Sequence, residues 1–336
     1  MVAYAAGAAP DVIMTVQYWL QDYYDNGILE PLEDQFNAWE DKDDFFPNVM
    51  EQVRSKAGQP IMMIPQTSIP YFNFYRADWF EEAGLAVPDT YDEFIAAAKA
   101  LTKAPDRYGY ALRGQKYSAI QVILPIWHKG RRQLERDGSV DFDSPEAIDV
   151  TDKRVGMLTR DKSCQPTAIN DGYRELYALM EKSKCAMWLY GPHASPALMA
   201  ALGDAIQGAP NPRVGEDRYM LANPEGPMLV SSCPEKEAAW EFIKFITTGD
   251  AAMLYTANRA VPPVRHSLAE ADVFQNNRFI KMSLDESDTW WTPPYHDENW
   301  TNFQDKIAPF WQETLGEKMS AAEFNQMGAR LLRGEA

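Results

Sequence analysis

The sequence predicts an α/β fold with mainly parallel sheets, on two observations. First, short apolar runs typical of strands alternate with capped, amphipathic helix patterns along the whole 336-residue chain. Second, the stretch MWLYGPHASPAL (187–198) reads as a buried strand leading into a helix. Gly191-Pro192 ends the apolar run, Ser195 can cap the helix, and Pro196 suits its first position. A hydrophobic fraction of 46% indicates a globular chain, long enough for two compact lobes or one large domain.

The other elements follow from local patterns. Thr90 and Glu93 form a capping box before one helix, and Ser144-Pro145 opens another. In the first half we expect a strand at 12–16, charged helices within 20–57 around a linker at 27–32, a strand at 59–65, an extended aromatic run at 71–75, helices at 78–83 and 91–101, a strand at 108–112 and a helix at 119–130. In the second half we expect helices from 144 and at 171–183, turns at 208–212 and 223–227, a strand at 228–232, helices at 235–247 and 250–257, an extended connector at 261–265, and two last helices separated at Gly316.

Composition narrows the classes of partner. A formal net charge of −17 argues against nucleic acid and anionic membrane surfaces, because both attract basic patches. No apolar run approaches the roughly 18 residues of a membrane span, and the first residues lack the pattern of a secretory signal. Three cysteines allow at most one disulfide and form neither a disulfide scaffold nor a metal cluster. Ten Trp and sixteen Tyr supply flat faces that suit sugar rings as well as protein cores.

Four stretches carry a resemblance to a known family. They are GAAPDV (7–12), YRADWFEEAGL continuing to TYDEF (75–94), CAMWLYGPHA (185–194), and AAWEFIKF continuing to PPVR (238–265). In this order they resemble the extracellular solute-binding proteins of ATP-driven importers, in particular the sugar-binding group that includes maltose-binding protein. Two departures stand out. The family's first lobe opens with a strand, a helix and a second strand before the PDV segment. We expect either that the first lobe here lacks them and has an open sheet edge, or that these residues are missing from this sequence. His193 stands where the family's sugar binders often carry Trp, which favours a more polar or charged ligand.

The resemblance implies a two-lobe periplasmic-binding-protein-like fold of type II, with lobes joined by crossing strands. Lobe 1 would comprise residues 1–67 and 232–273, and lobe 2 residues 68–231 and 274–336. A ligand held between the lobes favours the closed form, which a membrane permease then recognises. The resemblance further implies a monomer at the periplasmic or extracellular face, with no cofactor and no nucleic-acid partner. The signal that would direct its export is not expected within this sequence.

A sugar or polyol site needs aromatic faces and a few fixed donors and acceptors. Residues at predicted strand ends, and at positions that the family places in its cleft, give these candidate ligand-binding residues: Gln17, Tyr18, Trp19, Gln66, Thr67, Arg113, Tyr117, Gly191, His193, Trp290, Trp291 and Tyr295, with Gln115 and Trp300 as secondary candidates. For each aromatic residue, packing in a core is the alternative. Arg113 is either a surface ion-pair partner or a fork for an acidic group on the ligand, while Trp240 and Arg265 are expected to be structural.

Two other functions compete with binding for transport. A glycosidase would need two carboxylates across a cleft, about 5 Å or about 6.5–9.5 Å apart, but none of the 49 acidic residues lies in a catalytic motif. No G-x-S-x-G, Walker or H-E-x-x-H motif occurs either. We therefore assign no catalytic or metal-binding residue. The third alternative is a sugar receptor that takes no part in transport.

Overall fold

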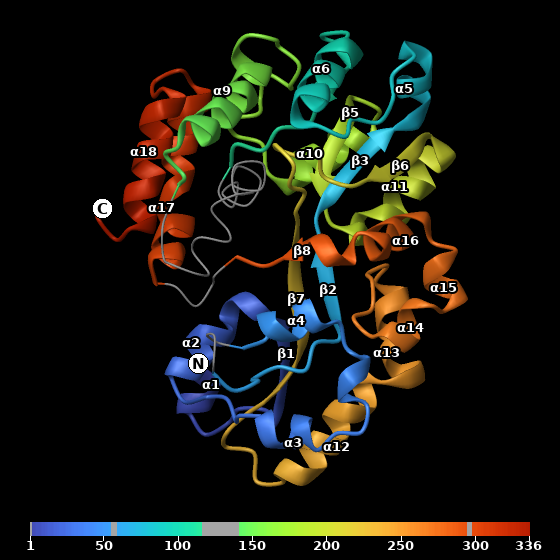
Figure 1. Cartoon of the computed structure of the whole chain (residues 1–336), viewed down its shortest axis with the longest axis vertical. Helices are drawn as coiled ribbons and strands as arrows, with labels where there is room; N and C mark the ends of the chain where they lie inside the picture. Colours follow the sequence, from blue (N-terminus) through green and yellow to red (C-terminus); the bar gives the residue numbers. More distant parts are fainter. Residues whose placement is uncertain (1, 55–58, 116–140, 294–297) are drawn as a thin grey trace. The chain divides into compact units, whose positions relative to one another are not determined.

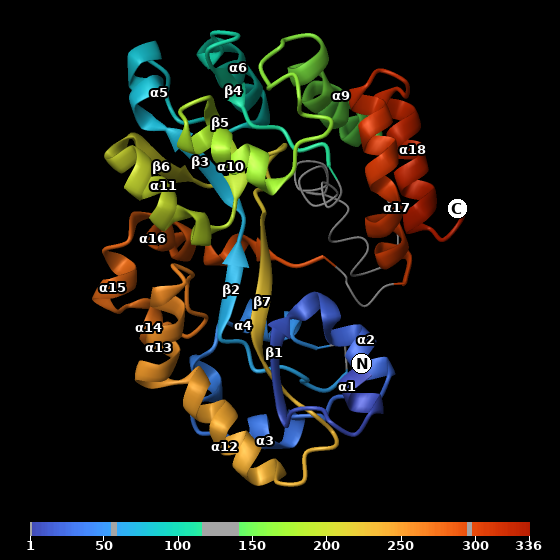
Figure 2. The ribbon, with the colours of Figure 1, turned by 180° about the vertical axis from the view of Figure 1, so that it is seen from behind.

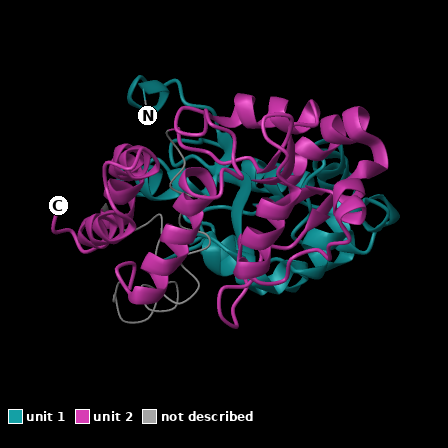
Figure 3. Ribbon diagram, turned by 90° about the horizontal axis from the view of Figure 1, so that it is seen from above, with its two compact units in different colours: residues 1–70, 221–296 teal, residues 71–220, 297–336 magenta. Residues whose placement is uncertain are grey.

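The computed structural model describes residues 2–54, 59–115, 141–293 and 298–336. The chain forms two compact units, coloured separately in Figure 3: unit 1 comprises residues 1–70 and 221–296, and unit 2 comprises residues 71–220 and 297–336. Each unit combines a four-stranded sheet with helices, as labelled in Figure 1. None of the described helices has both the length and the apolar character needed to cross a membrane.

The unit limits differ from the predicted lobe limits. The chain passes from one unit to the other after residues 70, 220 and 296, whereas the sequence placed these changes after 67, 231 and 273. Phe274 explains the last difference, because it is fully buried in a cluster with Ala252, Leu268 and Ile280, all of unit 1.

Unit 1 is built around the long strand β7 (Met220–Leu229), whose first residue belongs to unit 2. Strand β7 pairs antiparallel with β1 (Val12–Val16) on one side and β2 (Thr67–Pro70) on the other, and it also pairs with β8 (Trp290–Trp291). The helices of this unit are α1 (Val2–Ala5), η1 (Gln17–Trp19), α2 (Leu20–Asp25), α3 (Glu33–Asn37), η2 (Lys42–Asp44), α4 (Pro47–Gln52), α12 (Lys236–Thr247), α13 (Gly249–Asn258), α14 (His266–Ala269), α15 (Asp272–Gln275), α16 (Arg278–Asp285) and η5 (Ser287–Thr289).

The turn expected at 223–227 is wrong, because these residues lie inside β7. Gly226 shows why the strand tolerates this composition. A Cβ atom at this position would lie 2.0 Å from the carbonyl oxygen of Ile64, so only glycine lets the neighbouring segment approach. That segment is hydrogen-bonded at both ends, since the N–H of Ile64 donates to Pro227 (3.1 Å) and the N–H of Gln66 donates to Glu225 (2.9 Å). The strand expected at 59–65 is reduced to a single bridge between Arg54 and Ile61.

Unit 2 has a sheet in the order β4-β5-β3-β6. Its strands are β3 (Phe72–Arg76), β4 (Tyr108–Tyr110), β5 (Cys185–Tyr190) and β6 (Ile206–Ala209). Its helices are α5 (Ala77–Ala83), α6 (Tyr91–Leu101), α9 (Pro145–Thr159), α10 (Tyr173–Glu181), η3 (Pro192–Ala194), α11 (Ser195–Leu202), η4 (Gly203–Ala205), α17 (Glu298–Leu315) and α18 (Ala321–Leu332). Helices α17 and α18 pack together and both contact α9, as Figure 1 and the reverse view in Figure 2 show.

Side chains of β5 alternate between the two faces of this sheet, as strand geometry requires. Trp188 stacks on Phe74 of β3 and lies near Tyr173 and Tyr177 of α10. Leu189 lies on the opposite face, toward α6 and α9. The sheet therefore separates an α10 face from an α6–α9 face.

Local predictions were confirmed where a cap or a hydrophobic pattern defined them. Helix α6 has the predicted bounds and the predicted capping box, in which the N–H of Glu93 donates to Thr90 Oγ1 (3.3 Å) and the N–H of Thr90 donates to Glu93 Oε2 (3.0 Å). Ser144 caps α9 as expected, but Ser195 is the first residue of α11 and makes no cap bond. The helix expected at 119–130 lies outside the described residues.

The expectation of mainly parallel sheets is wrong for the strand pairs whose register the structure describes. Only β4 and β5 run parallel, while β1–β7, β2–β7, β3–β5 and β3–β6 are antiparallel. The reason is topological, since β7 returns beside both β1 and β2, and β3 lies between two strands that run against it. All three cysteines are buried free thiols.

Candidate functional site

In unit 1, the predicted residues Gln17, Tyr18 and Trp19 form η1, the turn that follows strand β1. Tyr18 and Trp19 are 41% and 44% exposed, and their ring centroids lie 5.3 Å apart. Gln17 is buried, and its Oε1 has no hydrogen-bond partner among the described residues. The turn therefore presents two aromatic rings beside a buried amide oxygen that can still accept a hydrogen bond.

Gln66 and Thr67 lie close to η1, because Val16 and Thr67 pair with the same residue, Glu225, from opposite sides of β7. Both side chains are buried and already donate hydrogen bonds within unit 1. Gln66 Nε2 donates to the carbonyl of Ile246 (2.5 Å), and Thr67 Oγ1 donates to the carbonyl of Pro262 (2.6 Å). Each thus ties the start of β2 to a neighbouring segment. Oε1 of Gln66 is buried and has no partner among the described residues.

The tryptophans of β8 lie in the interior of unit 1. Trp290 is fully buried, its ring lies 5.9 Å from that of Phe46, and its Nε1 donates to the carbonyl of Ser283 (3.1 Å). Trp291 is 2% exposed. In this structure both rings therefore pack rather than present an open face. Trp300, a secondary candidate, is likewise buried and stacks on Phe303 in unit 2. Tyr117 and Tyr295 lie outside the described residues.

In unit 2, the Gly191-Pro192 turn follows β5 and leads into η3. Gly191 is buried and His193 is exposed. The imidazole of His193 lies 5.0 Å from the ring of Tyr190, at an interplanar angle of 63°. The turn therefore places a polar ring beside Tyr190, the last aromatic residue of the strand.

Tyr190 is the centre of an aromatic group that we call the Tyr190 cluster: Tyr71, Tyr173, Trp188, Tyr190 and His193. The rings of Trp188 and Tyr190 are stacked at 4.6 Å and 5°, and those of Tyr173 and Tyr190 at 4.7 Å and 27°. Tyr71 meets Tyr190 edge-on at 5.7 Å. Trp188 is fully buried, whereas Tyr173 is 36% exposed. The cluster therefore begins in the core of unit 2 and ends at its surface.

Arg113 belongs to the same neighbourhood. Burial raises the pKa of Tyr190 above its usual value and the neighbouring tyrosines Tyr71 and Tyr173 add to this, while the positive charge of Arg113 opposes it. The charge of Arg113 therefore acts on the central residue of the Tyr190 cluster. Arg113 itself is half-buried, and its carbonyl accepts a hydrogen bond from Trp311 Nε1 (3.1 Å).

Gln165 fixes the backbone that leads to Arg113. Its Oε1 accepts a hydrogen bond from the N–H of Leu112 (3.1 Å), and its Nε2 donates to the carbonyl of Leu112 (2.6 Å). Nε2 also donates to Asp171 Oδ2 (3.0 Å), just before α10. Both ends of this buried amide are thus used to hold the loop after β4 against the start of α10.

The structure therefore gathers the predicted residues into one set in each unit. Unit 1 joins η1 to the start of β2, and unit 2 joins Arg113, Gly191 and His193. Sequence reasoning missed Tyr71, Tyr173 and Gln165. The alternation of Trp188 and Tyr190 along β5 does predict that these two rings share one face of the sheet, which is the face that Tyr71 and Tyr173 contact. Aromatic rings beside a guanidinium and an imidazole suit non-covalent recognition of a polar ring or chain. Within the described ranges, no group of three or more His, Cys, Asp or Glu could hold a metal ion.

Comparison with known proteins identifies the family of this chain. Residues 2–253 match the model of the family described as bacterial extracellular solute-binding protein. A protein of Brucella abortus (strain 2308), named only as a binding protein, is 25% identical over 296 residues, which are 81% of this chain and 67% of that protein. The mannitol-binding protein of Pseudomonas aeruginosa (strain PAO1) is 26% identical over 226 residues, 61% of this chain and 49% of that protein.

Among solved structures, maltose-bound MalE3 of T. maritima superimposes with a TM-score of 0.86 at 22% identity, over 100% of this chain and 87% of that one. This likeness shows that the fold is the two-lobe fold of solute-binding proteins. The family match also confirms the resemblance drawn from the four sequence stretches. The chain belongs to the bacterial extracellular solute-binding protein family.

Proposed function

We propose that this protein captures a carbohydrate or a polyol and delivers it to the permease of an ABC importer. The observation that carries the proposal is the Tyr190 cluster, which brings the exposed ring of Tyr173 and the half-buried rings of Tyr71 and Tyr190 together with His193 and the charge of Arg113. Sugars and polyols present C–H faces to aromatic rings and hydroxyl groups to polar side chains. The mannitol bound by the Pseudomonas relative and the maltose bound by MalE3 support the same class of ligand.

Unit 1 carries its own candidate residues for a carbohydrate or polyol. Tyr18 and Trp19 offer two further rings, and Gln17 offers an unused acceptor. A ligand that contacts residues of both lobes shifts the population toward the closed form, by its difference in affinity for the two forms. The family's extracellular description supports action at the periplasmic or outer face. We further propose that the protein acts as a monomer and performs no chemical step.

The acidic-ligand variant of the proposal rests on Arg113. A guanidinium binds a carboxylate through two parallel hydrogen bonds, which a neutral hydroxyl cannot reproduce. We infer that a sugar acid binds more tightly than the corresponding neutral sugar. His193 also favours a sugar acid, because imidazole offers a hydrogen bond and less stacking area than the larger ring that the family often has at this position.

The proposal is tested by thermal unfolding with a ligand panel: mannitol, maltose, glucose and glucuronate. We expect saturable stabilisation by at least one of them, with no product detected by chromatography. Tyr173→Ala should weaken this binding about two- to tenfold, from the roughly 0.5–1.5 kcal/mol of an aromatic contact. Phe245→Ala, an exposed aromatic on α12, is the matched control and should leave affinity unchanged. Product formation would instead indicate a glycosidase, and silence across the panel would favour a scaffold whose binding cleft is vestigial.

The variant Arg113→Met separates the two ligand classes. If the ligand carries an acidic group, its affinity should fall by tenfold or more while binding of neutral sugars changes little. Equal effects on glucuronate and glucose would contradict the acidic-ligand variant but leave the carbohydrate proposal standing.

A further inference from the structure

A second, separate site lies on the α6–α9 face of the unit 2 sheet. There the structure encloses a cavity of about 30 Å³, lined by Asn73 of β3, Leu189 of β5, Tyr91 and Phe94 of α6, Arg154 of α9, and residues of the 211–219 loop. This volume holds about two water molecules, since one needs roughly 10–15 Å³ of such space. Because Trp188 and Leu189 point to opposite faces of the sheet, the cavity is distinct from the Tyr190 cluster.

The lining carries a buried positive charge. Arg154 is 5% exposed, and its guanidinium carbon lies 4.7 Å from the ring centroid of Tyr110, 5.6 Å from Phe94 and 5.9 Å from Tyr91. An arginine remains charged at every physiological pH, so burial does not neutralise it. The aromatic faces and the neighbouring Tyr110 hydroxyl offset part of the lost hydration, and an anion in the cavity would offset more.

Tyr91 supplies the second observation. It is 4% exposed, lines the cavity, and its hydroxyl has no hydrogen-bond partner among the described residues. A buried hydroxyl without a partner calls for an ordered water or an ion as its acceptor. The surrounding amides are already engaged, since Asn73 Nδ2 donates to Asn211 Oδ1 (3.1 Å) and Asn211 Nδ2 donates to the carbonyls of Tyr71 and Tyr219 (3.0 Å each).

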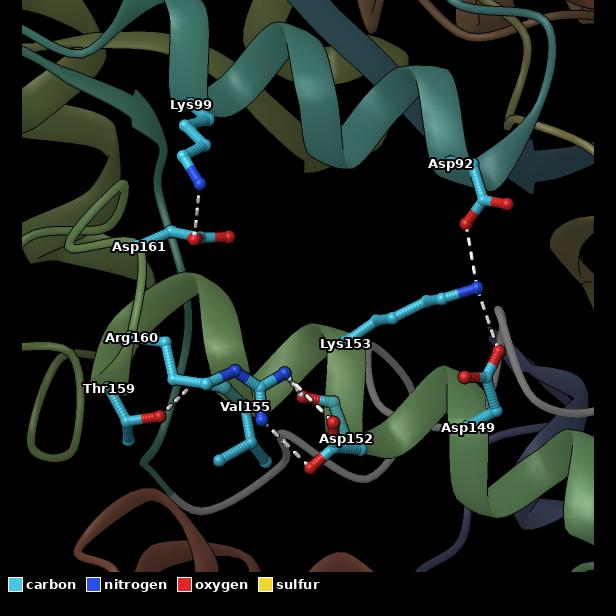
Figure 4. A network of polar contacts seen from close by, with 9 residues as sticks. All are labelled: Asp92, Lys99, Asp149, Asp152, Lys153, Val155, Thr159, Arg160 and Asp161. Carbon is cyan, nitrogen blue, oxygen red and sulfur yellow. Dashed lines mark hydrogen bonds and ion pairs between the residues drawn. The ribbon is translucent and has the colours of Figure 1, made fainter.

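Ion pairs at the surface join the two helices that carry part of the cavity lining, as Figure 4 shows. Lys153 of α9 reaches Asp92 of α6 and Asp149 of its own helix, at 2.7 Å each, and Lys99 of α6 reaches Asp161 just beyond α9 at 3.0 Å. These contacts therefore join the helix that carries Tyr91 to the helix that carries Arg154. Asp217 is the negatively charged side chain of the lining, and it lies half-buried on the loop.

From this cavity, its buried cation and its unused hydroxyl, we propose that unit 2 binds one small inorganic anion, of the size of chloride, between α6 and α9. Arg154 supplies the charge and the Tyr91 O–H donates a hydrogen bond. The ion neutralises the centre of the α6–α9 face and stiffens the helix pair. This site goes beyond the proposed carbohydrate function and does not depend on it.

The test is chloride-35 NMR line broadening on the full chain, with ionic strength held constant by sodium sulfate, whose anion is too large for the cavity. We expect saturable broadening that bromide displaces, and anomalous scattering should place bromide beside Arg154 in crystals. Tyr91→Phe should weaken chloride about tenfold, as for a hydrogen bond to a charged group. Asp217→Asn should strengthen it about two- to tenfold by removing a like charge.

Arg154→Met should abolish the broadening, whereas Arg160→Met, an exposed arginine of the same α9 region paired with Asp152, is the matched control and should not change it. If Arg154→Met fails to fold, the Tyr91 and Asp217 variants carry the test. Absent broadening in the wild type, equal broadening in Tyr91→Phe and the wild type, or weaker chloride binding in Asp217→Asn would each overturn the proposal and leave a cavity that holds water only.

Discussion

The substitution Asp44→Asn removes the partner of a buried arginine in unit 1. Arg265 is 4% exposed, and its Nε donates to Asp44 Oδ2 at 2.8 Å. Asp44 also accepts hydrogen bonds from the N–H (2.8 Å) and the Oγ (2.5 Å) of Ser267. The guanidinium lies over Phe45, 4.4 Å from the ring centroid. These contacts hold the extended connector at 261–265, whose Pro262 carbonyl accepts a hydrogen bond from Thr67. The ion pair therefore stabilises the segment that positions this candidate residue.

The expected loss in the free energy of unfolding follows from the burial of both side chains of the ion pair. Breaking a fully buried ion pair costs about 3–5 kcal/mol, and the side chain of Asp44 is 21% exposed, which places Asp44→Asn near 3 kcal/mol. For a unit of this size that lowers Tm by about 6–12 °C. Calorimetry and urea unfolding followed by tryptophan fluorescence measure both values. Asp41→Asn is the matched control, because Asp41 is 60% exposed and lies 3.8 Å from Arg265 Nη2. Equal losses in the two variants would refute the reasoning.

Four further predictions concern stability and reactivity. Burial raises the pKa of Asp44, but hydrogen bonds from Ser267 and the Arg265 guanidinium lower it by more, so the pKa lies below its usual value. The stabilisation of the fold by Asp44 should therefore be complete above the unfolded pKa of about 3.9 and lost as the pH falls through the folded pKa. In acid titrations, the difference in stability between the wild type and Asp44→Asn should close below about pH 4. Thr90→Ala should cost about 1 kcal/mol in urea unfolding by removing the capping box, and Ser320→Ala, which removes the equivalent box of α18, should cost a similar amount. Gly109→Ala should destabilise unit 2 by several times more than Thr90→Ala, because the new Cβ would lie 1.8 Å from the carbonyl oxygen of Ala98; a loss under about 1 kcal/mol would contradict the close approach. Cys164 and Cys185 should resist a thiol reagent at about pH 8 until the protein unfolds. Burial raises the pKa of Cys164 to about 12 and that of Cys185 well above its usual value, so neither thiol forms the reactive thiolate. Rapid labelling of the native protein would be inconsistent with their burial.

Local signals predicted the elements that depend on few residues. The box formed by Thr90 and Glu93 predicted the bounds of α6, and the apolar run before Gly191 predicted β5. These features are set by neighbours within one turn of helix or along one strand, so the sequence alone contains the information.

Features that depend on distant partners could not be read in this way. Residues 223–227 have the composition of a turn, and only pairing with β1 and β2 together with the close approach of Ile64 makes them a strand. Residue type does not distinguish a buried Trp290 from an exposed Trp19, because either position suits an indole. Arg113 was predicted from its place after a strand, whereas Gln165, which holds that backbone, lies more than fifty residues away.

The measurement that tests the central claim most directly is isothermal titration calorimetry with the stabilising member of the panel, followed by chromatography of the recovered ligand. We predict one ligand bound per chain, affinity reduced by Tyr173→Ala but not by Phe245→Ala, and a ligand recovered unchanged; Arg113→Met should reduce affinity as well when that ligand is glucuronate. Binding heats identical in all four proteins, or a chemically altered ligand, would contradict the account.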